Sequence, residues 1–67
     1  MDLKEIREEI GMSRYRLAKI SGISPTSIKN IENRLNSPTL NTIIKLSDAM
    51  EMKPEELVAK LTEDLDF

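Results

Sequence analysis

Residues 13–34 read SRYRLAKISGISPTSIKNIENR, and this stretch predicts two short helices joined by a glycine turn. Each helix has its own start signal. Ser13 precedes a run of periodic apolar residues, and Ser24 precedes Pro25, so that an N-cap residue is followed by the residue best suited to the first helical position. Gly22 lies between the two, and glycine takes a positive φ at little steric cost. The stretch therefore predicts a sharp reversal that sets the second helix across the first.

Three more helices are predicted around this pair. Apolar residues recur at steps of three and four within residues 2–11 and again within residues 39–51, where Thr39 is the expected N-cap. A last helix is expected from Pro54 onward, where acidic residues in the first turn suit the helix dipole. The expected core residues are Leu3, Ile6, Ile10, Leu17, Ala18, Ile20, Ile28, Ile31, Leu40, Ile43, Leu46, Met50, Leu57, Val58 and Leu61. The fold class is therefore expected to be all-α, a compact five-helix bundle forming a single domain over residues 1–67, with residues 62–67 as a frayed tail or a dimer contact.

Composition argues against an enzyme. The chain of 67 residues contains no cysteine and no histidine, so disulfides, thiolate zinc sites and the commonest general base are missing. We expect no metal, no cofactor and no small-molecule ligand. The first ten residues, MDLKEIREEI, lack the apolar run of a secretory signal, and no segment approaches the roughly 20 apolar residues of a membrane span. A cytoplasmic protein without a membrane partner is the expectation.

The charge is unevenly distributed along the chain. The formal net charge is −2, which by itself argues against binding to phosphates. Residues 13–36, however, carry five basic side chains against one acidic, a net charge of +4, whereas residues 37–67 carry three basic against seven acidic, a net charge of −4. The basic charge thus coincides with the two-helix stretch, as expected of a helix-turn-helix that binds DNA, and the acidic remainder favours one orientation by repulsion. For Arg16 and Lys19 the alternative is an ordinary solvated face.

Several short motifs together carry a family resemblance. They are Arg7 then Gly11, Leu17-Ala18, Gly22-Ile23-Ser24, Ile28, Ile31-Glu32, Pro38, and Met50 through Leu57. With these motifs, from about Leu3 to Leu61, the chain resembles the lambda-type repressor and Cro (XRE-like) helix-turn-helix family of small DNA-binding regulators. The resemblance implies that the second and third helices form the helix-turn-helix, that the third enters the major groove, and that a two-fold dimer binds an inverted-repeat operator.

The resemblance, with side-chain chemistry, implies four base contacts in the third helix. Thr26 and Asn30 are four residues apart on one face, where Asn30 suits adenine and the Thr26 methyl group suits thymine. Lys29 suits a guanine or a phosphate, and Pro25 offers apolar contact only. Ordinary surface polarity is the alternative for Thr26 and Asn30. The positions implied to contact phosphates are Arg14, Arg16, Ser24, Asn33, Arg34 and Asn36.

The resemblance also implies a structural ion pair between Arg7 and Glu32, for which two independent surface charges are the alternative. Three positions depart from the family pattern. Arg14 replaces a usual glutamine, which predicts a charged phosphate contact but looser positioning of the third helix. Arg34 and Glu51 replace usual glycines at helix ends, so the third helix needs a left-handed Asn33, a strained Arg34 or a different exit.

The last two predicted helices and the tail carry more apolar residues than each helix needs to bury one face. Its members are Ile44, Val58, Leu61, Leu65 and Phe67. They are interpreted as the interface of a two-fold dimer, and the alternative is that some of them seal the core.

The function predicted is that of a sequence-specific DNA-binding transcriptional regulator, a repressor that binds double-stranded DNA as a homodimer. An activator or restriction-modification controller is the close alternative, and a protein-binding module of the antitoxin or anti-repressor type is the alternative from another class. A hydrolase is least favoured, because Ser13 and Ser24 have no histidine to activate them and are explained as helix caps.

Overall fold

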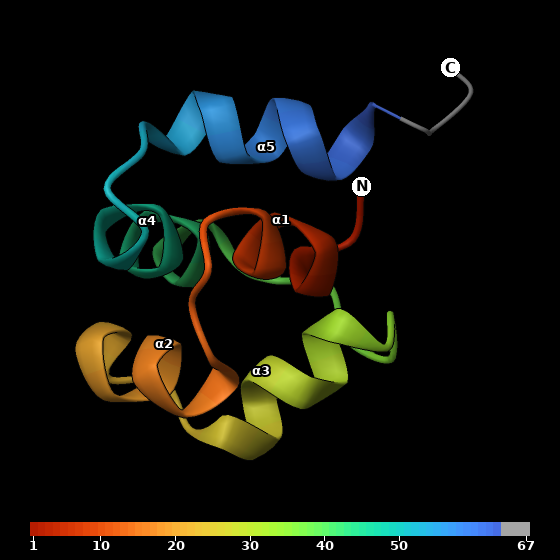
Figure 1. Ribbon diagram of the computed structural model, residues 1–67. Coiled ribbons are helices and arrows are strands. Elements are labelled where there is room, and N and C mark those ends of the chain that lie inside the picture. The colour runs from red at the N-terminus through yellow and green to blue at the C-terminus, as the bar shows by residue number, and fades with distance from the viewer. Residues whose placement is uncertain (64–67) are drawn as a thin grey trace.

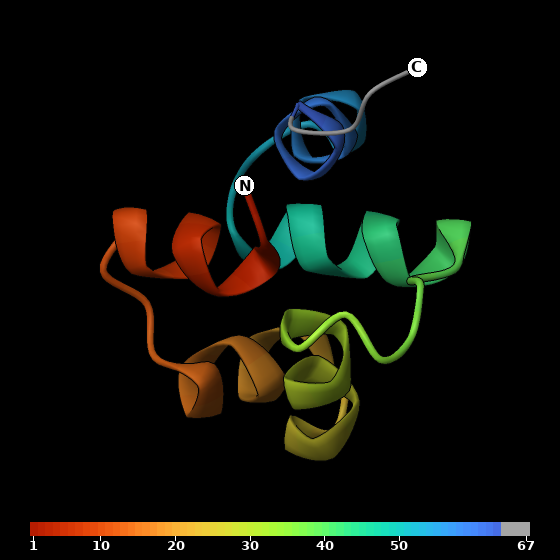
Figure 2. The same ribbon diagram turned by 90° about the vertical axis from the view of Figure 1, so that its right-hand side faces the viewer.

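Five helices and no strand make up the part of the chain that the computed structural model describes, residues 1–63. They are α1 (Leu3–Glu9), α2 (Arg14–Ser21), α3 (Pro25–Glu32), α4 (Leu40–Ala49) and α5 (Pro54–Thr62). The predicted all-α class and five-helix bundle are confirmed. In Figure 1 the α2 and α3 pair lies at the opposite side of the molecule from α5, with α1 and α4 between them, and the turned view of Figure 2 shows the same order.

The predicted start signals act as side-chain caps. Ser13, Ser24 and Thr39 each accept a hydrogen bond from the backbone N–H three residues on, and Asp2 forms a capping box with Glu5. Such a cap satisfies one of the N–H groups that the first turn leaves without a partner. The helix α5 has no side-chain cap and begins instead with proline and an acidic first turn.

The helices α3 and α4 end without the glycine that is usual in the family, and a non-glycine residue takes the left-handed conformation in each case. Asn33 has a φ of −89°, and Arg34 takes the left-handed conformation with a φ of 58°. The N–H groups of Arg34 and Leu35 bond to the carbonyls of Ile31 and Asn30, at 3.1 and 2.8 Å, which is the Schellman pattern normally closed by glycine. Glu51 ends α4 in the same way, with a φ of 56°. Both non-glycine residues are therefore held in a conformation that costs free energy.

The core lies where the five helices meet, and it contains Leu3, Ile6, Leu17, Ala18, Ile28, Ile43, Leu46, Ala49, Met50 and Leu57. Ile31 and Leu61 are partly buried against it. Four residues expected in the core are instead exposed, namely Ile10, Ile20, Leu40 and Val58. In α2 the buried face is centred between Leu17 and Ala18, and Ile20 lies about 110° around the helix from that centre, so it is 50% exposed. Leu40, the first residue of α4, is 74% exposed because it precedes the turns that pack on α2 and α5.

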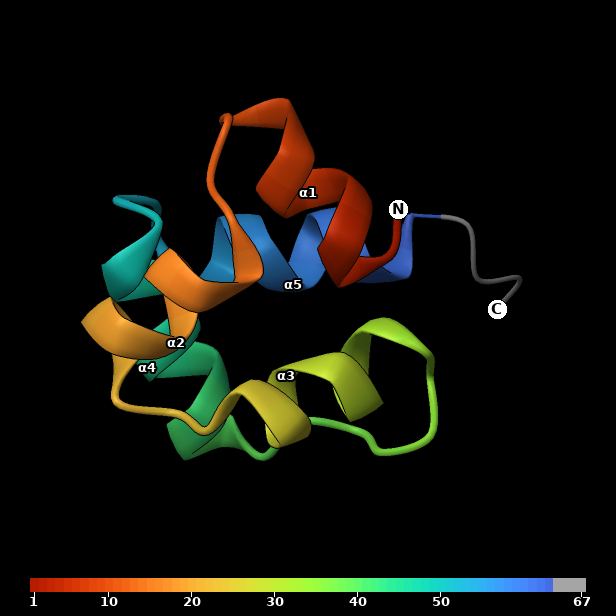
Figure 3. The same cartoon turned by 60° about the horizontal axis from the view of Figure 1, so that its bottom comes forward.

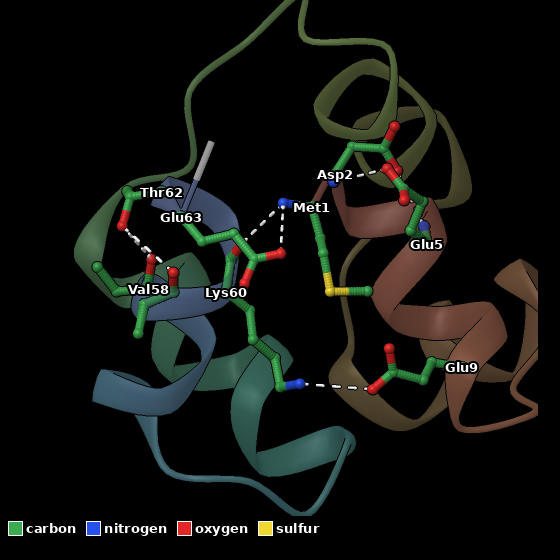
Figure 4. Close-up of polar contacts among 9 residues, drawn as sticks. Met1, Asp2, Glu5, Glu9, Val58, Lys60, Thr62 and Glu63 are labelled. Atoms are coloured by element: carbon green, nitrogen blue, oxygen red, sulfur yellow. Dashed lines mark hydrogen bonds and ion pairs between the residues drawn. The ribbon is translucent and has the colours of Figure 1, made fainter. Parts of the chain in front are cut away.

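The start of the chain is fastened to the last helix. The amino group of Met1 donates to the carbonyl of Lys60 at 2.9 Å and lies 3.3 Å from Oε1 of Glu63 (Figure 4). Nζ of Lys60 lies 3.4 Å from Oε1 of Glu9 at the end of α1. These contacts hold α5 beside α1, on the side of the molecule away from α2 and α3.

Candidate nucleic-acid interface

The helices α2 and α3 form one unit around the turn at Gly22. This glycine has a φ of 75°, and its N–H donates to the carbonyl of Ala18 at 3.0 Å, which ends α2. Leu17 and Ile28, one from each helix, are fully buried. Figure 3, viewed with this side forward, shows α3 lying across the molecule with α2 beside it. The sequence therefore folds locally into the helix-turn-helix that was predicted.

One side of α3 is turned to solvent. Pro25, Thr26 and Lys29 are exposed, and Asn30 is half-buried, so the predicted base-contact positions differ in how far they reach outward. The opposite side of the helix carries Ile28 into the core. An exposed strip of polar side chains on an outer helix can present hydrogen-bonding groups to the base edges of a major groove.

Ser27 is on α3 but was not among the predicted contact residues. It is exposed next to Thr26, and its Oγ accepts a hydrogen bond from Oγ of Ser24 at 2.9 Å. Ser24 Oγ also accepts from the Ser27 N–H at 3.1 Å, so Ser24 acts as the cap of α3. Its hydroxyl hydrogen can reach a phosphate only after it turns away from Ser27. A signal was present in the sequence, because Ser27 is three positions after the N-cap Ser24, whose side chain is expected to bond to the backbone N–H there.

The predicted phosphate-contact positions lie on α2, at the N-cap of α3 and at or just after the end of α3. Arg16 is exposed on α2, and Asn33, Arg34 and Asn36 are exposed at the end of α3 and in the loop that follows. Figure 3 shows α2 and this loop on opposite sides of α3. Charged and polar groups on both flanks of a recognition helix suit the two phosphate backbones that border a groove.

The buried carboxylate of Glu32 connects α1, α2 and α3. Nε of Arg7 donates to Oε2 of Glu32 at 2.8 Å, and Nη1 of Arg7 donates to the carbonyl of Met12 at 2.8 Å. Nε and Nη2 of Arg14 lie 3.0 and 2.9 Å from Oε1 of Glu32. Arg7 and Glu32 are both buried. Within residues 1–63 every buried side-chain nitrogen and oxygen has a hydrogen-bond partner, so the cluster leaves no buried polar atom unsatisfied.

This cluster corrects the expectation for Arg14. Its side chain is not turned wholly to solvent but is 37% exposed and bonded to the last residue of α3. The arginine in place of the usual glutamine therefore keeps a side-chain contact with α3, made by a charged pair instead of a neutral hydrogen bond. Unlike the pair of Arg7 and Glu32, this pairing was not implied by the family resemblance, and no local pattern indicates a contact between residues 18 positions apart.

The proposed dimer residues are only partly within the described chain. Ile44 and Val58 are exposed, Leu61 packs partly buried against the core, and Leu65 and Phe67 lie outside the described residues. Leu40 is exposed one helical turn before Ile44, on the same side of α4, and was not included in the predicted set.

No group of three or more histidine, cysteine, aspartate or glutamate side chains suited to hold a metal is found within residues 1–63. Over the same part of the chain, the helices are too short and too polar for any of them to span a bilayer.

Comparison with known proteins gives a family match over most of the chain. A family described as helix-turn-helix matches residues 3–57. The chain is 33% identical over 58 residues to the cryptic phage CTXphi transcriptional repressor RstR of Vibrio cholerae, covering 87% of this chain and 52% of that protein. It is 34% identical over 50 residues to the antitoxin HipB of Escherichia coli, covering 75% of this chain and 57% of HipB.

A third relative is the HTH-type transcriptional regulator PuuR of Escherichia coli, 41% identical over 44 residues, which are 66% of this chain and 24% of PuuR. The chain thus spans between about a quarter and three fifths of the length of these three relatives. No solved structure gives a significant match.

Proposed function

Because this chain belongs to the helix-turn-helix family of DNA-binding transcriptional regulators, in its XRE-like branch, we propose that it is a repressor. In this proposal a two-fold dimer binds an inverted-repeat operator, and α3 of each protomer enters the major groove. The observation that carries the proposal is the outward side of α3, where Thr26, Lys29 and Asn30 stand on the basic segment of an otherwise acidic chain.

Each base-contact residue has a role that its chemistry suits. The amide of Asn30 pairs with N6 and N7 of an adenine, and the methyl group of Thr26 meets the methyl group of a thymine. Lys29 donates to a guanine or to the neighbouring phosphate. Pro25 adds apolar contact, because it has no N–H to donate. The half-buried position of Asn30 supports a fixed orientation of its amide, which a bidentate contact requires.

The proposed phosphate contacts hold the protein on the duplex without reading its sequence. They are made by Arg14, Arg16, Ser24, Asn33, Arg34 and Asn36. The acidic segments that follow favour this orientation, because they repel the phosphates.

The proposed dimer forms through the apolar residues of α4 and α5. Ile44 and Val58 are exposed there. Val58 and Leu61 also line an open groove of about 390 Å³, whose other lining residues include Pro38, Arg34 and Asn36. A two-fold contact places two recognition helices one duplex turn apart, about 34 Å. Leu65 and Phe67 belong to the same proposed interface.

Repression is favoured over activation by the name of one relative, a transcriptional repressor that this chain covers to 52% of its length. The second candidate, an antitoxin-type module that binds another protein, is favoured by the relative HipB. We expect a cytoplasmic protein that needs no cofactor and catalyses no reaction.

One selection experiment tests the proposal. The purified chain is incubated with random duplexes, and the bound fraction is sequenced over several rounds. Affinity for the enriched duplex is then measured between 50 and 200 mM salt. Over this range the affinity falls by about 10³-fold or more when six or more phosphates are contacted. Enrichment of an inverted repeat with salt-dependent affinity is expected. Enrichment of a single half-site overturns the dimer, and no salt-dependent binding to any duplex overturns DNA binding and favours the antitoxin-type module.

A further inference from the structure

The open groove of about 390 Å³ lies between the end of α5 and the loop that follows α3. Val58, Leu61 and Thr62 line it from α5, and Arg34 and residues 36–38 line it from the loop. Figures 1 and 3 show the end of α5, this loop and the start of the chain on the same side of the molecule. The groove therefore connects a residue of the proposed dimer surface, Val58, with a proposed phosphate contact, Arg34.

Part of the lining of the groove is apolar and belongs to the core. Leu3, Ile31 and Ile43 line the groove together with Leu61. Ile31 and Leu61 are only partly buried against the core, so they present apolar surface to the groove. Contact of this surface with water is unfavourable, and an apolar side chain that covers it lowers the free energy of the protein.

The charge on the lining favours an anionic group at one end of the groove. Within residues 1–63 the charged side chains that line it are Arg34 and Asp2. Asp2 accepts a hydrogen bond from the N–H of Glu5 as the N-cap of α1. Arg34 is exposed in the left-handed turn that ends α3, and a guanidinium has five N–H donors, which suffice for more than one partner. A carboxylate in the groove therefore pairs best with Arg34.

The chain itself carries a segment of matching chemistry directly after α5. Residues 64–67 read DLDF, in which acidic and apolar residues alternate. Along an extended backbone successive side chains point to opposite sides, so this order separates two apolar side chains from two carboxylates. The segment begins two residues after Thr62, which lines the groove, and four extended residues reach at most about 14 Å. The groove is therefore within reach of the segment.

We propose that residues 64–67 occupy the groove of their own chain, with Leu65 and Phe67 against its apolar lining and an aspartate carboxylate at Arg34. This placement keeps the two apolar residues beside Val58, in agreement with their place in the proposed dimer interface. Its consequence for DNA binding rests on the proposed function, in which Arg34 contacts a phosphate. The carboxylate then competes with the phosphate for Arg34, so the segment weakens binding to every duplex alike.

Occupation of the groove is tested by NMR in the absence of DNA. Phe67 is the only phenylalanine of the chain, so its ring protons are identified without ambiguity. We expect nuclear Overhauser effects between this ring and the methyl groups of Ile31 and Leu61. A mixture of isotope-labelled and unlabelled chains is the control, because effects between the two populations place the segment in the groove of a second copy and overturn occupation within one chain. No effect between the ring and the groove overturns the docking altogether.

Competition at Arg34 is tested by comparing two double variants that each raise the net charge by two. Asp64→Asn with Asp66→Asn removes the acidic groups of the segment. Glu55→Gln with Glu56→Gln is the control, because these two residues are exposed in the first turn of α5 and do not line the groove. Affinity for a random duplex is measured as a function of salt by fluorescence anisotropy. We expect a log-log salt slope larger by about 0.9 per bound protomer in the first pair than in the control, which corresponds to one more phosphate contacted.

Equal slopes for the two double variants overturn the competition, whether both slopes change or neither does. If the wild-type chain binds no duplex while the ring of Phe67 contacts Ile31 and Leu61, the proposed function fails and the docking of the segment stands. The two failures are thereby distinguished.

Discussion

Nε of Arg7 in α1 donates a 2.8 Å hydrogen bond to Oε2 of Glu32 at the end of α3, although the two residues are 25 positions apart. The contact connects α3, and with it the helix-turn-helix formed by α2 and α3, to α1. Because both partners are buried, the pair adds little net stability compared with an apolar pair of similar size. Removal of one partner, however, leaves the other as an unpaired buried charge.

Glu32→Ala is therefore expected to lower the free energy of unfolding by about 3–5 kcal/mol, since it leaves two arginines facing each other without a carboxylate. Urea unfolding followed by circular dichroism measures the change. Glu8→Ala, at an exposed position of α1, is the control and is expected to change stability by no more than about 0.5 kcal/mol. Equal midpoints for the two variants contradict a structural role of the pair.

Glu51→Gly is expected to stabilise the protein. Glu51 ends α4 with a φ of 56°, and glycine removes the strain of that conformation at the cost of a more flexible unfolded chain. The net gain should be about 0.5–1 kcal/mol. Lys45→Gly, at an exposed position within α4, should lose about 1 kcal/mol in the same unfolding assay. A loss of stability in both variants rules out strain at Glu51.

Gly22→Ala tests the turn of the helix-turn-helix. A Cβ atom at this position meets no atom within 4 Å, so the cost is that of the backbone conformation and not of a clash. We expect a loss of about 1 kcal/mol. Gly22→Asn should cost less, because asparagine tolerates the left-handed region better than alanine. Should alanine and asparagine prove equally stable in thermal unfolding, the conformational explanation fails.

Asn30→Ala and Lys29→Ala are expected to affect DNA binding differently. Loss of the Asn30 amide should reduce discrimination between the operator and a point-substituted operator by about 1–3 kcal/mol, with little change in non-specific affinity. Loss of Lys29, if it contacts phosphate, should weaken binding to every duplex and reduce the salt slope by about 0.9. Fluorescence anisotropy on both duplexes measures these effects, and unchanged discrimination in Asn30→Ala removes it from the base contacts.

Replacement of Ile44 and Val58 by glutamate is expected to dissociate the proposed dimer. Both side chains are exposed, so Ile44→Glu with Val58→Glu should leave the fold intact while burying two charges in the proposed interface. Sedimentation equilibrium should then give half the wild-type mass. Ile20→Glu, an equally exposed apolar position on α2, serves as the control and should keep the wild-type mass. A wild-type mass for the double variant places the dimer contact elsewhere.

Most of the helix boundaries could be predicted from the sequence. Ser13, Ser24 and Thr39 cap the helices that they were expected to start, because a cap acts on an N–H only three residues away. Which apolar residues face the core was predicted less well. Ile20 and Leu40 fit the helical spacing, but whether a residue at the edge of a face is covered depends on where the neighbouring helices lie.

The sequence by itself determined the five helices, the glycine turn and the basic segment, because caps, prolines, glycines and charge counts act within a turn or need no partner. Only the tertiary structure decided that Arg14 shares Glu32 with Arg7, because that contact requires α1, α2 and α3 to converge on one buried carboxylate. It also decided that Arg34 and Glu51 take left-handed conformations, since the packing of the helices that they join outweighs the local strain.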